Sequence, residues 1–167
     1  MSNKQIEHDL IEAVENDEIV RVKQLLDAGA DVTVVNEEEM PLLLIAIKKG
    51  ASKEMVELLL NAGANIEWKT DEGVSLLDEA VERNRIDLAE LFIECGIDPA
   101  VTSRKSGMTT LMLAACFDYI DMMEMLLSRG ADLYAVDEIG MGATDYARKL
   151  GRKRAHKWLE EKMANPF

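Results

Sequence analysis

Four copies of a short glycine-centred turn are spaced almost evenly along the chain. They read Ala28-Gly29-Ala30-Asp31, Ala62-Gly63-Ala64-Asn65, Cys95-Gly96-Ile97-Asp98 and Arg129-Gly130-Ala131-Asp132. Their glycines are separated by 34, 33 and 34 residues. Self-similarity at a fixed period of this length indicates stacked supersecondary units rather than one globular core, because a single unit cannot bury its own hydrophobic face.

Each unit is predicted to contain two helices, the second of which ends at the glycine turn. Amphipathic runs lead into the four glycines, at residues 22–26, 55–60, 88–93 and 122–127. Glycine ends these helices readily because it adopts the left-handed conformation without a Cβ penalty. A shorter helix opens each unit, and Ser75 and Thr109 are expected to be N-cap residues.

The unit resembles the ankyrin repeat, which reads G-x-T-P-L-H-x-A-A, a turn, and then V-V-x-L-L-L-x-x-G-A-D. The match is most specific in the fourth unit, at Gly107, Thr109, Leu111, Ala114, Ala115, Leu126, Leu127, Gly130, Ala131 and Asp132. The resemblance covers nearly the whole chain. It implies one all-α repeat solenoid over residues 1–167, with about five helix-turn-helix units joined by β-hairpin-like loops. The repeats are placed at about 4–35, 36–67, 70–100, 104–136 and 137–164.

Several positions depart from the ankyrin pattern. The motif histidine is replaced in every repeat that carries the position, by Leu44, Asp78, Met112 and Asp145. Ser52 and the Thr102-Ser103 region each appear as a one-residue insertion. In the family the histidine bonds backbone between repeats, so its loss implies lower stability. Both ends are expected to be capping repeats with a polar outer face, so that the array is complete within the chain.

Charge and composition limit the classes of partner. The net charge is −13 and the isoelectric point is about 4.6. The resulting negative electrostatic field repels nucleic acid and anionic lipid and favours a neutral or basic protein as the partner. Alternatively, the acidic surface serves solubility alone. No apolar run approaches membrane-spanning length, the N-terminus lacks a signal-peptide pattern, and Cys95 and Cys116 do not suggest a disulfide framework. These features favour a reducing, cytoplasmic setting.

The sequence offers few groups for catalysis. His8 and His156 lie near opposite ends of the array, and neither has a reactive partner at motif spacing. We therefore expect no catalytic residues, no cofactor and no metal, and an enzyme is only a remote alternative. Cys116 has no adjacent cation to stabilise a thiolate. Met122, Met123 and Met125 match buried helix positions and are expected to belong to the core, and Trp158 is expected to face inward.

The resemblance implies a partner-binding surface on the concave face, formed by the hairpin tips and the exposed side of the short helices. The third unit's positions there are mostly charged, whereas the fourth and fifth units bring apolar residues to positions that usually face water. A contiguous apolar patch of this kind marks an interaction site. Trp68 is a candidate second anchor. The predicted contacts are Trp68, Lys69, Asp71, Arg83, Met108, Cys116, Phe117, Tyr119, Ile139 and Met141.

Alternatives remain for each of these groups. Phe117 and Leu150 could pack in the turns between repeats, and Trp68 could pack on the adjacent hairpin. The favoured function is a non-catalytic module that binds another protein, as an inhibitor, an immunity-type protein or an accessory factor. The chain is expected to be a monomer or a weak homo-oligomer. Self-association would use the apolar patch or the basic stretch at residues 148–157.

Overall fold

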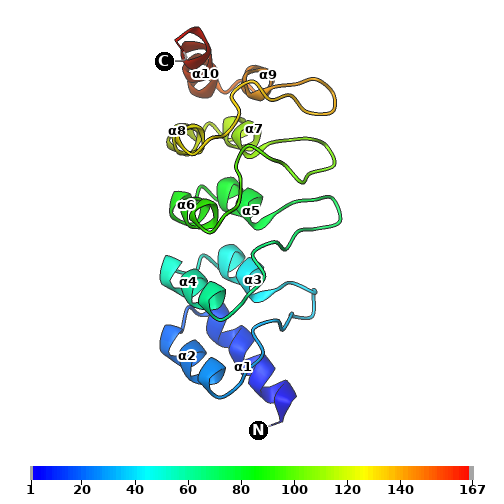
Figure 1. Ribbon diagram of the computed structural model, residues 1–167, viewed down its shortest axis with the longest axis vertical. Coiled ribbons are helices and arrows are strands. Elements are labelled where there is room, and N and C mark those ends of the chain that lie inside the picture. Colours follow the sequence, from blue (N-terminus) through cyan, green and yellow to red (C-terminus); the bar gives the residue numbers. More distant parts are fainter. Residues whose placement is uncertain (1, 166–167) are drawn as a thin grey trace. The chain divides into compact units, whose positions relative to one another are not determined.

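Within residues 2–165, ten helices alternate with turns and extended loops, as the repeat pattern predicts (Figure 1). The computed structural model describes residues 2–165. Within that range, extended pairing is limited to two isolated antiparallel bridges, Val35 with Pro41 and Lys69 with Ser75. The helices fall into two compact units, Met1–Trp68 and Lys69–Phe167. The predicted all-α helical repeat architecture is confirmed.

The first unit contains four helices: α1 (Asn3–Glu15), α2 (Ile19–Asp27), α3 (Leu42–Lys49) and α4 (Lys53–Asn61). Helix α1 packs against α2 and α3, and α4 packs against α2 and α3. Fully buried Leu10, Val14, Val22, Ile45 and Met55 form its core. Ser2 is the N-cap of α1, and its hydroxyl accepts a hydrogen bond from the backbone N–H of Gln5.

The second unit contains three helix pairs. These are α5 (Leu76–Glu82) with α6 (Ile86–Glu94), α7 (Thr110–Cys116) with α8 (Ile120–Ser128), and α9 (Ala143–Lys149) with α10 (Lys153–Ala164). The shorter helices α5, α7 and α9 stack on one another, and the longer helices α6, α8 and α10 form a second stack. Hairpins project beside the shorter helices (Figure 1). Met122, Met123 and Met125 are buried, as predicted.

The recurring glycine turn combines two conformational devices. Each glycine has a positive φ, at +92° in Gly29, +96° in Gly63, +108° in Gly96 and +102° in Gly130. The following Asp or Asn side chain accepts a hydrogen bond from the backbone N–H two residues later, at 2.8–3.0 Å. The glycine thus ends the helix, and the acidic or amide residue fixes the loop that follows.

The inter-helix turns tie neighbouring repeats together inside each unit. Asp17 accepts hydrogen bonds from the backbone N–H and hydroxyl of Ser52, at 3.1 and 2.9 Å. In the second unit Asp118 accepts the backbone N–H of Ala155 at 2.7 Å. Ser52 is also the N-cap of α4. The serine that looks like an insertion in the sequence is therefore a cap and a contact between repeats.

Candidate interaction surface

Three hairpins and the helices that follow them form one side of the second unit, which we call the hairpin face: residues 69–75, 103–109 and 136–142 with α5, α7 and α9. Backbone hydrogen bonds close the first and last hairpins, from Thr70 N to Val74 O at 3.0 Å and from Asp137 N to Met141 O at 2.9 Å. The middle hairpin is closed differently, because the Thr102 hydroxyl donates to the carbonyl of Met108 at 2.6 Å. In this hairpin, which carries the extra residue near Thr102-Ser103, a side-chain hydrogen bond thus takes the place of the backbone hydrogen bond that closes the other two.

Consecutive hairpins of the hairpin face are bonded to each other. The N–H of Lys105 donates to the carbonyl of Glu72 at 3.1 Å, and the N–H of Glu138 donates to the carbonyl of Ser106 at 3.0 Å. The Ser103 hydroxyl donates to the carbonyl of Gly73 at 2.6 Å. This contact is so close that a Cβ at Gly73 would lie 1.8 Å from Ser103 O. The hairpin tips are therefore held in a fixed register before any partner binds.

Asp78 occupies the position of the motif histidine in the third repeat and is 3% exposed. One of its carboxylate oxygens accepts hydrogen bonds from the backbone N–H and hydroxyl of Ser75, at 2.8 and 3.0 Å. The other lies 3.3 Å from Nε of Arg104, on the next hairpin. Nε meets the distance of an ion pair without the alignment of a hydrogen bond, so this link between repeats is chiefly electrostatic.

Local caps also replace the histidine in the following repeats. Thr109 caps α7 by accepting the N–H of Met112 at 3.2 Å, and Met112 Sδ lies 3.4 Å from the N–H of Thr109. In the last repeat Asp145 accepts the N–H of Gly142 at 2.9 Å. Ser75 and Thr109 are thus N-caps, as the sequence predicts. In these two repeats the residue at the histidine position bonds within its own repeat, whereas Asp78 caps its own helix and also pairs with Arg104 of the next hairpin.

The last hairpin is fastened to α9 by a short hydrogen bond from the Tyr146 hydroxyl to the Asp137 carboxylate. The same carboxylate accepts the N–H groups of Ile139 and Met141, at 3.0 and 2.9 Å. These bonds stabilise the ionised form and lower the pKa of Asp137, the Tyr146 hydroxyl contributing most. The carboxylate in turn raises the pKa of Tyr146 to about 12. This network holds Ile139 at the hairpin tip.

The turn between α7 and α8 carries the predicted aromatic residues. The rings of Phe117 and Tyr119 are stacked, with centroids 5.3 Å apart. The Tyr119 hydroxyl donates to the carbonyl of Glu82 in the preceding repeat, at 3.3 Å. Phe117 remains 40% exposed. Tyr119 therefore has a packing role, and Phe117 presents the free side of the stacked pair.

Cys116 is half-buried at the end of α7. Arg152 Nε donates to its backbone carbonyl at 2.7 Å. Burial raises the pKa of the Cys116 thiol, and the positive charges of Arg152 and Arg104 offset this only in part. The thiol thus lacks the lowered pKa of a reactive cysteine, even though two arginines that are distant in sequence lie near it.

The structure divides the predicted apolar contacts into two groups. Ile139 lies at a hairpin tip and is 74% exposed, while Met108 and Met141 are half-buried at hairpin bases. Cys116, Phe117 and Tyr119 follow α7 at its other end. A seven-residue helix separates the groups, a rise of about 10 Å. Phe117 and Tyr119 are in contact with each other, and α7 lies between them and the hairpin group.

The predicted charged contacts are exposed. Lys69 and Asp71 lie on the first hairpin of the second unit, and Arg83 at the end of α5 forms an ion pair with Glu79 at 2.6 Å. Trp68 is half-buried and belongs to the first unit, whereas the other predicted contacts belong to the second.

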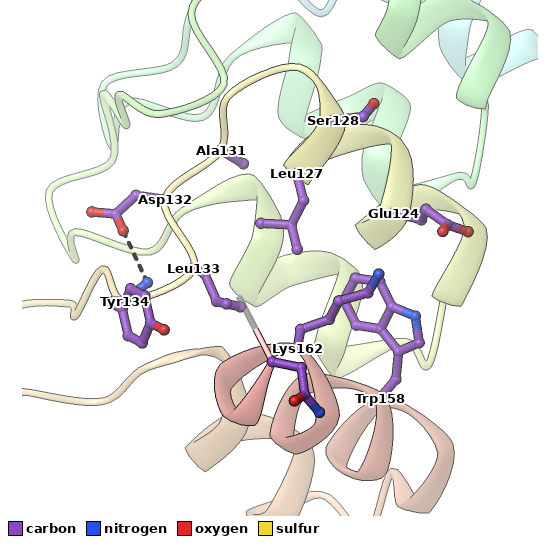
Figure 2. A pocket seen from close by; sticks show the side chains of 10 residues that line it. Glu124, Leu127, Ser128, Ala131, Asp132, Leu133, Tyr134, Trp158 and Lys162 are labelled. Atoms are coloured by element: carbon purple, nitrogen blue, oxygen red, sulfur yellow. Dashed lines mark hydrogen bonds between the residues drawn. The ribbon is translucent and has the colours of Figure 1, made fainter. Parts of the chain in front are cut away.

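A groove on the other stack of helices was not predicted from the sequence. It has a volume of about 550 Å³ and lies between α8, the loop after it and α10, lined in part by Tyr134, Trp158 and Lys162 (Figure 2). Trp158 is half-buried and forms part of the wall, so the expectation that it faces inward is met only in part. The sequence nevertheless contains one signal for this groove. Trp158, a large ring, occupies the position that Met125 has in α8, and Lys162 follows it one helical turn later.

Two features are absent from residues 2–165. No cluster of three or more His, Cys, Asp or Glu in this range could hold a metal ion. None of its helices is long and apolar enough to cross a bilayer.

Comparisons with known proteins agree with the geometry. The family described as ankyrin repeats (3 copies) matches residues 10–103, and the single ankyrin repeat matches residues 106–138. An ankyrin repeat-containing protein of Treponema pallidum (strain Nichols) is 30% identical over 143 residues, covering 85% of this chain and 47% of that protein. The ankyrin repeat and KH domain-containing protein mask-1 of Caenorhabditis elegans is 29% identical over 153 residues, covering 90% of this chain and 6% of its own length.

A third relative matches a shorter stretch. The 2-5A-dependent ribonuclease of Homo sapiens is 38% identical over 74 residues, which is 44% of this chain and 10% of that protein. The chain thus spans about half the length of the Treponema relative and a small part of the other two. The helix pairs, the bonded hairpins and the family matches together lead to one conclusion: this chain belongs to the ankyrin repeat family.

Proposed function

We propose that this chain is a non-catalytic module that binds another protein through the hairpin face of its second unit. The observation that carries the proposal is the bonded series of hairpins, which holds exposed side chains in place without a partner. Ankyrin repeats as a family are protein–protein interaction modules and are generally not enzymes. A surface that is ordered beforehand loses less entropy on binding, which favours recognition.

Ile139 is the central contact in this proposal. Its side chain is 74% exposed, and Val136 beside it on the same hairpin is 62% exposed. Burying a side chain such as Ile139 against a partner contributes about 1.5–3 kcal/mol. The backbone around it is fixed by the Asp137 network, so little ordering is required on binding. Phe117 supplies a second apolar contact, at the far end of α7.

Charged residues of the first hairpin form the rim of the proposed surface. Lys69 and Asp71 are exposed on this hairpin, Arg83 is exposed at the end of α5, and together they present both signs of charge. A polar rim around apolar contacts is the usual composition of a protein interface. The overall charge of −13 favours a partner that is neutral or basic where it meets this surface. Within this scheme the chain would act as an inhibitor, an immunity-type protein or an accessory factor.

The proposal is tested by locating the contact on an identified partner complex. The chain is used to capture a partner from a lysate of the organism that encodes it, and backbone hydrogen exchange is then compared between the free and bound protein. We expect increased protection in residues 103–109 and 136–142, and unchanged exchange in α1 and α2. Protection confined to α10 or to the first unit would contradict the proposal. Size measurement at several concentrations separates capture of a partner from self-association.

A further inference from the structure

Aromatic and apolar side chains line the groove beside Trp158. Tyr134 and Trp158 lie at its two ends, and Leu127 and Leu133 lie between them (Figure 2). Its volume of about 550 Å³ is large enough for a long side chain and the backbone around it. The groove lies on the longer helices, away from the hairpin face, so an inference about it does not depend on the proposed function.

A cation already occupies the indole face in the free protein. Lys162 Nζ lies 5.2 Å from the centroid of the Trp158 ring. Within the part of the chain that the structure describes, this ammonium group forms no ion pair with a carboxylate. The contact is therefore a cation–π interaction of a half-buried lysine that has no ion-pair partner among the described residues, a single weak contact that another cation can displace.

Two carboxylates line the same groove. Glu124 projects from α8, and Asp132 follows the glycine turn, where one of its oxygens accepts the N–H of Tyr134 at 2.9 Å. Neither carboxylate forms an ion pair with another described residue. The groove therefore offers an aromatic face for a cation, an apolar floor for an aliphatic stem and a carboxylate on each of its two sides (Figure 2).

The groove is particular to the last helix pair of the second unit. Aligning Leu159 with Leu126 places Trp158 where α8 has Met125, and α6 has Leu91 at the same position. Met125 and Leu91 are buried, each 8% exposed, whereas Trp158 is half-buried. A larger ring at a less covered position leaves an indole face available to a ligand, which the preceding repeats do not provide.

We propose that this groove binds an arginine side chain from a basic segment of a partner protein, with the guanidinium group replacing Lys162 over Trp158. Arginine suits the site better than lysine because its planar guanidinium stacks on aromatic rings and also forms paired hydrogen bonds with carboxylates. Leu127 and Leu133 would contact its aliphatic stem. A second copy of this chain is disfavoured as the occupant, because it also carries a net charge of −13.

The test uses Trp158 as its own reporter. Trp68→Phe leaves Trp158 as the only tryptophan, since the chain has two. This protein is titrated with an acetylated and amidated Gly-Arg-Leu-Arg-Gly peptide, and in parallel with the same peptide in which citrulline replaces arginine. We expect a saturable, salt-sensitive fluorescence change with the arginine peptide alone. An equal response to the neutral citrulline peptide would overturn the proposal.

Three variants separate displacement of Lys162 from a general charge effect. Lys162→Met should tighten arginine-peptide binding by about two- to five-fold, because it removes the competing cation. Lys153→Met makes the same charge change in the first turn of α10 and should leave binding unchanged. Glu124→Gln should weaken binding. Equal tightening of peptide binding by both lysine variants would overturn the proposal. A fluorescence change on raising the protein concentration without peptide would also overturn it, because it would indicate self-association at the groove.

Discussion

Arg104 Nε lies 3.3 Å from Oδ1 of Asp78, and this ion pair joins two consecutive repeats beneath the hairpin face. The Asp78 and Arg104 side chains are 4% and 17% exposed. The pair stands where the family motif has a histidine that bonds between repeats. A link between repeats is therefore retained at this interface, with charge in place of the imidazole.

Removing Arg104 should destabilise the second unit strongly. Arg104→Met leaves the buried Asp78 carboxylate without its counter-charge, and we expect the free energy of unfolding to fall by about 3 kcal/mol. The matched control is Lys105→Met, which removes the exposed ion pair with Glu72 and should cost less than about 1 kcal/mol. Urea unfolding of both variants checks the difference. Similar losses in the two would contradict a specific role for the buried pair.

Gly73 and Gly140 have nearly the same backbone conformation, at φ +81° and +79°, and differ in their surroundings. Alanine at either position should cost about 1–2 kcal/mol for the left-handed backbone. Gly73→Ala should cost a further ~1–3 kcal/mol, because its Cβ would overlap Ser103 O and force the hairpins apart. Gly140 has no atom within 4 Å of its Cβ position. Thermal unfolding that ranks the two variants equally would argue against tight hairpin contact.

The Asp137–Tyr146 bond gives the second unit a distinctive alkaline pH dependence. The pKa of Tyr146 is raised to about 12 in the folded chain, from an ordinary value of 10.0. Its contribution to stability is therefore complete below pH 10 and is lost as the pH rises from 10 to about 12. Tyr146→Phe should be less stable than the wild type at pH 8, and this difference should shrink above pH 10. A difference that stays constant up to pH 12 would be inconsistent with the bond.

The same bond predicts a second change at acidic pH. The folded-state pKa of Asp137 is lowered from its ordinary value of 3.8, so its contribution is present above that value and is lost as the pH falls below it. Asp137→Asn removes this titration, and the variant should lose less stability than the wild type as the pH is lowered below 4. Unfolding followed by circular dichroism measures both.

The two cysteines should differ in reactivity. Burial raises the pKa of Cys116, so its thiolate is scarce at neutral pH, while the side chain of Cys95 is exposed. In the single-cysteine variants Cys95→Ala and Cys116→Ala, we expect iodoacetamide to modify Cys95 faster than Cys116 at pH 7.5. Mass spectrometry of the time course gives the rates. Faster modification of Cys116 would point to an activated thiol.

The sequence was sufficient to predict the repeat, its helices and most caps, because these depend on local patterns. Gly29 and its equivalents, Ser75 and Thr109 all have the predicted roles. The contacts of Asp78 with Arg104 and of Ser103 with Gly73 could not be predicted from the sequence. They join residues of different repeats, whose side-chain directions depend on how the hairpins stack.

The exposure of two residues of the proposed surface was predictable from the sequence. The repeat phase placed Ile139 and Phe117 at solvent-facing positions, and both are exposed. It could not show that Phe117 stacks on Tyr119, nor that α7 lies between these rings and the hairpin residues. The Trp158 groove was not predicted, because the position of Trp158 in the repeat assigns its side chain to the core. How much of that side chain is buried depends on the neighbouring residues of the folded chain.

The affinity of an identified partner for Ile139→Asp, compared with Val20→Asp, tests the proposed hairpin-face interaction most directly. Both changes place a carboxylate at an exposed apolar position, at 74% and 68% exposure, and Val20 lies in the first unit. We predict at least about tenfold weaker binding by Ile139→Asp and wild-type binding by Val20→Asp. Undiminished binding by Ile139→Asp, or an equal loss in both variants, would contradict a partner site on the hairpin face.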